Sequence, residues 1–154
     1  MSTAFNAEQF ANTVVEGANQ ESYIPIPAAD YQAYVDSTGF RPFMRDGEAT
    51  KVILDVTWIV PDDTLAAELG VEELRVKQSV FLDVTADMAI DFGTNKNVQL
   101  GQLRKALDLN DPKKPFSFND LINKSAMITV IEDPSKDDPA DVYNRVTKVH
   151  PVQS

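Results

Sequence analysis

The residues of this chain that are suited to chemistry are aromatic rings interleaved with positive charges. Residues 40–45 read Phe-Arg-Pro-Phe-Met-Arg, so two rings and two guanidinium groups lie within six positions. Rings stack on flat ligands, and arginine or lysine pairs with phosphate, a combination typical of surfaces that bind unpaired nucleic-acid strands. The candidate residues of this kind are Phe40, Arg41, Phe43, Arg45, Lys51, Lys77, Phe81, Tyr143 and Arg145.

Each candidate also has a structural interpretation. Aromatic side chains are often simply buried, so Phe40 and Phe43 are more typical of core at the end of a barrel than of a stacking surface. Phe81 is the better candidate, because it is an apolar residue on an otherwise polar strand face; the alternative is that the N-terminal helix or a partner subunit covers it. Four other basic residues, Arg104, Lys105, Lys113 and Lys114, are expected on a solvated helix face or turn.

The elements that must position these residues are mainly strands. β-type runs cover residues 31–43, 51–60, 76–85, 126–131 and 142–149, and a helix-like segment at 97–109 falls between the third and fourth. In 51–60, apolar Leu54, Val56 and Trp58 alternate with outward positions, and the same parity turns Lys77 and Phe81 outward. Five strands with a helix after the third predict a five-stranded OB-fold, a Greek-key barrel.

The remaining segments are short. Leu100, Leu103 and Leu107 give the helix at 97–109 a buried face, with Asn97 as its expected N-cap. Ser117 begins a second short helix that runs to residue 123, and one helical turn is expected at 64–69. Residues 8–16 predict an N-terminal helix that Gly17 ends. The prolines in Ile-Pro-Ile-Pro at 24–27 require an extended connector, so residues 1–30 form an extension and 31–154 the barrel domain.

Composition limits the classes of function. The chain has no cysteine, which removes disulfides and thiolate chemistry, and it has neither an apolar run of about 20 residues nor a signal-peptide pattern. We therefore expect an intracellular, cytoplasmic protein without membrane contact. The formal charge of −10 opposes nonspecific binding to nucleic acid. Residues 1–40 carry −5 without any Lys or Arg, and ten acids gather at 62–73 and 132–141, so the rest of 41–154 is net basic.

The sequence gives little support to catalysis. The one histidine, His150, ends a β-type run and is followed by proline, and there is no glycine-rich phosphate loop. Asp137, Asp138 and Asp141 could hold a divalent cation, but their spacing is not that of an EF-hand. Hydrolysis by a carboxylate pair stays open, because acids are plentiful and their separations are invisible in sequence. We expect no enzyme activity and no cofactor.

Three segments carry a resemblance to a known family. Gly-Gln-Leu-Arg-Lys-Ala-Leu at 101–107, Asn-Asp-Pro-Lys-Lys-Pro-Phe-Ser-Phe-Asn-Asp-Leu at 110–121 and Tyr-Asn-Arg-Val-Thr-Lys-Val at 143–149 are similar to phage-encoded single-stranded DNA-binding proteins of the OB-fold type. The resemblance covers residues 31–149 and implies coating of exposed DNA strands in phage replication or recombination, in host cytoplasm, with replication or recombination proteins as further partners. Many such proteins end in an acidic tail, which this chain lacks.

The resemblance thus predicts a non-catalytic binder of single-stranded DNA. The alternative is a structural or assembly protein of a virus that uses the same barrel to dock protein, which suits the acidic composition. The sequence leaves open a homo-oligomer, the length of strand covered, any sequence preference, and whether the acidic N-terminus takes over the role of an acidic C-terminal tail.

Overall fold

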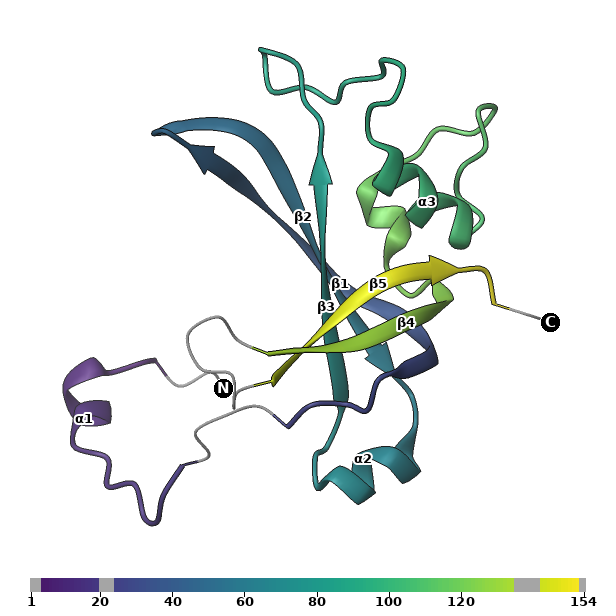
Figure 1. The fold of residues 1–154 in the computed structure, drawn as a ribbon. Helices are drawn as coiled ribbons and strands as arrows, with labels where there is room; N and C mark the ends of the chain where they lie inside the picture. The colour runs from purple at the N-terminus through teal and green to yellow at the C-terminus, as the bar shows by residue number, and fades with distance from the viewer. Residues whose placement is uncertain (1–3, 20–23, 135–141, 153–154) are drawn as a thin grey trace.

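The structure of the chain, a computed structural model, describes residues 4–19, 24–134 and 142–152. It contains one antiparallel sheet in the order β3-β2-β1-β4-β5, which leaves β3 and β5 as the two edges (Figure 1). The strands are β1 (Ala29–Arg45), β2 (Glu48–Val60), β3 (Leu74–Leu82), β4 (Ser125–Pro134) and β5 (Val142–His150). All five predicted strands are therefore confirmed, and the architecture is mainly β.

Strands β1 and β2 form a long hairpin that projects away from the rest of the sheet (Figure 1). Its turn residues Asp46 and Gly47 have φ angles of 53° and 82°. Two consecutive positive φ values are those of a type I′ turn, whose twist matches the twist of paired strands. A bulge follows at once, because Met44 pairs with Ala49 but Phe43 pairs with Lys51. This bulge sets the register from Phe43 to Ser37, and a second register shift lies between Ser37 and Val35.

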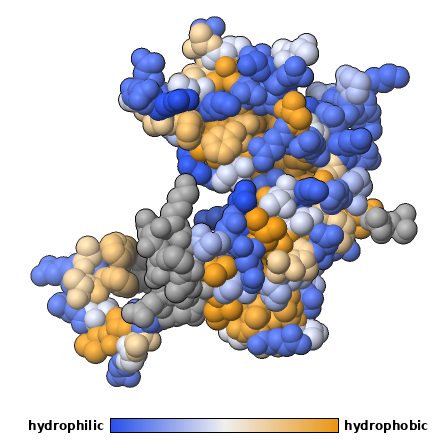
Figure 2. Space-filling view, in the orientation of Figure 1, coloured by the Kyte–Doolittle hydropathy of each residue, from blue (hydrophilic) through white to orange (hydrophobic). Residues whose placement is uncertain are grey.

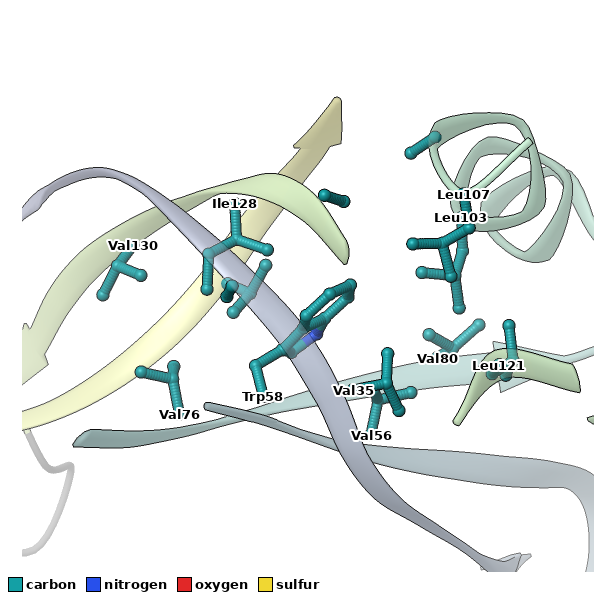
Figure 3. Packing of buried hydrophobic residues seen from close by; sticks show 14 of the residues in the cluster. Val35, Val56, Trp58, Val76, Val80, Leu103, Leu107, Leu121, Ile128 and Val130 are labelled. Carbon is teal, nitrogen blue, oxygen red and sulfur yellow. The ribbon is translucent and has the colours of Figure 1, made fainter. Parts of the chain in front are cut away.

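The core lies against the inner face of the sheet. In β3 buried and exposed residues alternate strictly, as the sequence predicts for a strand with one face on a core. Trp58 of β2 is fully buried at the centre, with Leu103 and Leu107 on one side and Ile128 and Val130 on the other (Figure 3). The inward parity predicted for Trp58 is thus confirmed.

Helix α3 (Val98–Ala106) covers one end of this core. Leu100, Leu103 and Leu107 are buried, as predicted. Asn97 occupies the N-cap position, as predicted, but its side chain makes no capping hydrogen bond to the helix. Its amide instead bonds both the backbone N–H and the backbone C=O of Asp83, at 2.8 and 2.9 Å. Asn97 therefore fastens the start of α3 to the end of β3.

Two short helices lie in connecting segments, one between β2 and β3 and the other between α3 and β4. Helix α2 (Asp63–Leu69) replaces the predicted single turn at 64–69, and the Asp62 carboxylate caps it by accepting from Leu65 N at 3.0 Å. The 3₁₀ helix η1 (Phe118–Leu121) lies where the second short helix was predicted, but ends two residues earlier. Asp120 accepts from the backbone N–H of Ser117 at 2.9 Å, which supports the predicted helix start.

The N-terminal segment is less attached than the connector that follows it. Helix α1 (Ala7–Ala11) is shorter than the predicted 8–16, so Gly17 does not end it, and none of its residues is buried. Its apolar side chains lie at the surface (Figure 2). Ile26, by contrast, is buried, and its N–H and C=O both bond the side chain of Asn144 on β5. Among the described residues no helix is long and apolar enough for a membrane crossing.

Candidate nucleic-acid interface

Five of the predicted site residues share one face of the sheet, which we call the outer face. The register aligns Arg41 of β1, Ile53 of β2 and Phe81 of β3 across the three strands. Phe43 of β1 pairs with Lys51 of β2, two residues from the Arg41–Ile53 pair and therefore on the same face. Lys77 lies four residues before Phe81 on β3, so its side chain also points to this face. Side chains directly opposite one another point to the same side of a sheet. The outer face therefore carries Arg41, Phe43, Lys51, Lys77 and Phe81.

The aromatic part of the outer face is a pair of rings. Phe43 and Phe81 meet edge to face, with centroids 5.5 Å apart and planes at 82°. This is a favoured aromatic arrangement, and it holds the two rings in fixed orientation. Phe81 is 42% exposed, whereas Ile53, which lies on this face of β2 directly opposite Phe81, is 2% exposed. The rings thus help to cover an isoleucine and still offer apolar surface to solvent.

The central charge of the outer face is an ion pair. Arg41 Nε donates to Asp55 Oδ2 at 2.7 Å, and the Ser79 hydroxyl donates to the other carboxylate oxygen at 3.1 Å. The hydrogen bond from Arg41 lowers the pKa of Asp55 below its usual range, with a smaller contribution from Ser79 and from the charge of Lys77. Asp55 is therefore ionised at neutral pH and offsets the charge of Arg41.

Lys51 and Arg145 are also paired with acids. Lys51 Nζ lies 3.3 Å from Asp83, whose pKa is lowered chiefly by the backbone N–H of Asn97 and also by Lys51. Arg145 Nε lies 2.7 Å from Asp133 on the neighbouring strand. Lys77 has no ion-pair partner within 4 Å among the residues that the structure describes. The outer face is therefore polar and nearly neutral, rather than strongly cationic.

A groove between the two edge strands joins the outer face to β5. This β3–β5 groove has a volume of about 500 Å³ and is lined by Lys77 and Phe81 on one side and by Tyr143 and Arg145 on the other. Lys77 and Ser79 also line a shallower groove that contains the Arg41–Asp55 pair. The two grooves thus share part of their wall, and five of the nine predicted residues line them: Arg41, Lys77, Phe81, Tyr143 and Arg145. Phe43 and Lys51 lie on the same outer face, where Phe43 contacts Phe81.

Phe40 and Arg45 lie outside the outer face and the β3–β5 groove, so the nine predicted residues do not form a single site. Phe40 pairs with buried Leu54 and so points to the opposite face, where it meets Phe118 edge to face at 5.0 Å. It is 52% exposed, so neither a buried core position nor the outer face describes it. Arg45 pairs with Glu48 beside the turn at the tip of the hairpin.

Arg104 is not on a freely solvated helix face as predicted. Its guanidinium donates twice to the carbonyl oxygen of Leu109, at 3.1 and 2.9 Å, and lies 4.3 Å from the centre of the Phe116 ring. A cation over a ring is attracted to its negative face. Arg104 thus fixes the loop after α3, and with Phe116 supports the cluster that contains Phe40 and Phe118.

Sequence reasoning missed Gln99, whose amide lies at the edge of β3. Its Oε1 accepts from Phe81 N and its Nε2 donates to Ser79 O, both at 3.3 Å. These are backbone groups that a neighbouring strand would otherwise satisfy. No signal in the sequence distinguishes Gln99 from any other polar residue on a helix.

The predicted cation ligands Asp137, Asp138 and Asp141 lie outside the described residues. Within 4–19, 24–134 and 142–152, no group of three His, Asp or Glu side chains is arranged to hold a metal ion. No model of a known protein family and no curated protein sequence matches the chain. The interpretation of this surface therefore depends on its geometry and chemistry.

Proposed function

We propose that the protein binds single-stranded DNA on its outer face, and coats exposed strands in phage replication or recombination without catalysis. The observation that carries this proposal is the Phe43–Phe81 pair, held exposed beside Lys77 and continuous with the groove that contains Tyr143 and Arg145. Stacking of bases on such rings, with cations along the strand, is the usual basis of binding that does not depend on sequence.

The topology supports the same proposal. The sheet order β3-β2-β1-β4-β5, with α3 between β3 and β4, is the chain order of an OB-fold. Strands β3 and β5 line one groove, which is the position at which an OB-fold barrel closes. OB-folds bind oligonucleotides on the strands that here are β2 and β3, and these strands carry the outer face.

The ion pairs on this surface determine how the binding should depend on salt. Arg41, Lys51 and Arg145 each have a carboxylate partner, so few cations are available to phosphates. Each phosphate contact in a single strand contributes about 0.7 to the slope of log affinity against log salt. The proposed binding therefore has a shallow salt slope and depends mainly on stacking.

A titration of the full chain with labelled oligothymidine at low and moderate salt tests the proposal. We expect binding at low salt that weakens only modestly when salt is raised. A steep loss of affinity would contradict the expectation that few cations of the outer face meet phosphates. No binding at low salt would contradict the proposed function. An oligothymidine duplexed with its complement is the matched control, since its bases cannot reach a ring.

The second candidate is a viral structural or assembly protein that docks protein on the same surface. The observation that favours it is the neutral, partly aromatic character of the outer face, which resembles surfaces that bind protein more than those that bind polyanions. Absence of oligonucleotide binding at low salt would support this candidate.

A further inference from the structure

A second cavity lies between α3, β3 and the end of β5, and we call it the α3 cavity. Its volume is about 650 Å³, and its wall contains the cationic side chains of Lys105 and Lys148 together with His150. No carboxylate of the described residues lines it. Three other cavities of the described residues each contain an acid, namely Asp55, Asp133 or Glu73. In a chain of charge −10, the α3 cavity is thus a local site suited to an anion.

The wall of the α3 cavity contains a buried amide with an unused donor. Gln78 is 5% exposed, and its Oε1 accepts from Trp58 Nε1 at 2.9 Å. An indole N–H only donates, which fixes the amide with its oxygen toward Trp58 and leaves Nε2 with two hydrogens. Among the described residues no acceptor takes them, and no enclosed side-chain nitrogen lacks a partner, so Nε2 is open to the cavity. A buried donor favours a ligand that accepts.

The rest of the wall suits a flat ring. Leu103, Ala106 and Val149 provide apolar surface, and Gln102 adds a second amide. A pocket of this size with apolar walls and a few placed polar groups is typical of small-molecule sites. The ligand that fits has a flat ring with an acceptor for Gln78 and an anionic group for the lysines. A nucleotide has both, because its base carries carbonyl oxygens or ring nitrogens and its phosphate is anionic.

The α3 cavity continues the path of the proposed strand. Gln99 and Thr147 line both this cavity and the β3–β5 groove, which contains Phe81. We propose that the α3 cavity takes one nucleotide of the bound strand. Its base accepts a hydrogen bond from Gln78 Nε2, and its phosphate pairs with Lys105 and Lys148. This inference rests on the proposed function, and it extends the binding surface beyond the outer face.

Trp58 supplies a direct probe of occupancy, because it is the only tryptophan and it bonds Gln78. The full chain is titrated with an oligothymidine of about 16 nucleotides while Trp58 emission is followed. The test variant is Lys105→Gln/Lys148→Gln, and the control is Lys113→Gln/Lys114→Gln, which removes the same charge from an exposed turn after α3. All four lysines are exposed, so both variants should fold, as circular dichroism would verify.

We expect the wild type and the control to change Trp58 emission on binding. The test variant should bind about fivefold more weakly, with a lower salt slope, and should lose the emission change even at saturation. Equal binding by both variants with silent Trp58 would overturn the inference and leave the proposed function intact. No oligothymidine binding at low salt would refute the proposed function. In that case a titration with thymidine monophosphate tests the α3 cavity separately from the proposed function. A change in Trp58 emission that requires Lys105 and Lys148 would support a nucleotide site in the cavity. No change in emission would overturn the inference.

Discussion

Asp55→Asn is the substitution that tests most directly whether the nearly neutral outer face meets phosphates. The Asp55 carboxylate lies at the centre of the outer face and holds Arg41 at 2.7 Å. If a phosphate passes about 6 Å from this carboxylate, the repulsion in water-like surroundings is about 0.7 kcal/mol. Its removal should strengthen binding about threefold. It also frees Arg41 for a phosphate, which should steepen the salt slope by about 0.7.

The assay is a titration with labelled oligothymidine at several salt concentrations, with Asp36→Asn as the control. Asp36 pairs with Arg75 at 3.2 Å, so the control also removes one negative charge and one ion pair, but outside the grooves that contain Arg41 and Phe81. We expect Asp36→Asn to bind like the wild type. If Asp55→Asn binds no more tightly than the control, or if its salt slope is unchanged, then the outer face does not meet phosphates.

The same substitution predicts a pH dependence of stability. The pKa of Asp55 is lowered in the folded protein, mainly by the hydrogen bond from Arg41. The ion pair therefore stabilises the fold above the unfolded pKa of about 4 and loses this effect as pH falls through the folded value. The small difference in melting temperature between wild type and Asp55→Asn should be present at neutral pH and should vanish under strong acid. A difference that grows on acidification would contradict the assignment.

Three further substitutions and one deletion test the surface, the N-terminal segment and the core. Phe81→Ala should weaken oligothymidine binding by about 1–3 kcal/mol without changing the salt slope, whereas Lys77→Ala should lower that slope; the reverse pattern in a salt titration would refute the assigned roles. Deletion of residues 1–22 keeps buried Ile26 and should leave the melting temperature nearly unchanged while it strengthens binding, because acidic residues are removed; weaker binding would oppose this. Leu103→Ala should cost about 2–5 kcal/mol of stability in urea denaturation, and a cost near zero would show that α3 does not seal the core.

Period-two alternation made the strands predictable, but not the face on which each residue of β1 lies. A two-residue turn at Asp46 and Gly47 would alone put Arg41 opposite Val52, on the inner face. The bulge after Phe43 shifts the pairing by one residue and puts Arg41 opposite Ile53 instead. A shift of one residue exchanges the two faces of a strand. Sequence patterns do not reveal such a bulge, so the Arg41–Asp55 pair could not be predicted.

The separation of Phe40 from Phe43 was, in contrast, predictable. The two residues are three positions apart, and an odd spacing on a strand without a bulge between them puts the side chains on opposite faces. The dense cluster of rings and arginines at 40–45 therefore divides between two surfaces. Residues that are close in sequence at 40–45 therefore do not form one cluster in space. Phe43 and Phe81, by contrast, are 38 residues apart in sequence and are in contact.

Local rules also failed where a tertiary partner competed. Asn97 has the residue type of an N-cap, and it occupies that position, but its φ of 55° is left-handed and its amide bonds the backbone of Asp83. Those bonds join a strand end to a helix start, and Asp83 in turn holds Lys51. A contact between residues 14 apart therefore replaced the local cap and fixed one of the predicted cations, which propensity alone does not indicate.

The pairing of cations with acids bears on which nucleic acid the surface would select. Duplex DNA offers a dense array of phosphates but keeps its bases stacked inside, so it would meet the ion pairs at Arg41, Lys51 and Arg145 and gain little from Phe81. An unpaired strand offers fewer phosphates but has free base faces that can stack. Neutralising most cations therefore weakens duplex binding more than single-strand binding, because only the single strand retains the contribution of the rings. On this argument the acidic partners of the three cations serve selectivity, and their removal should raise affinity for duplex more than affinity for oligothymidine.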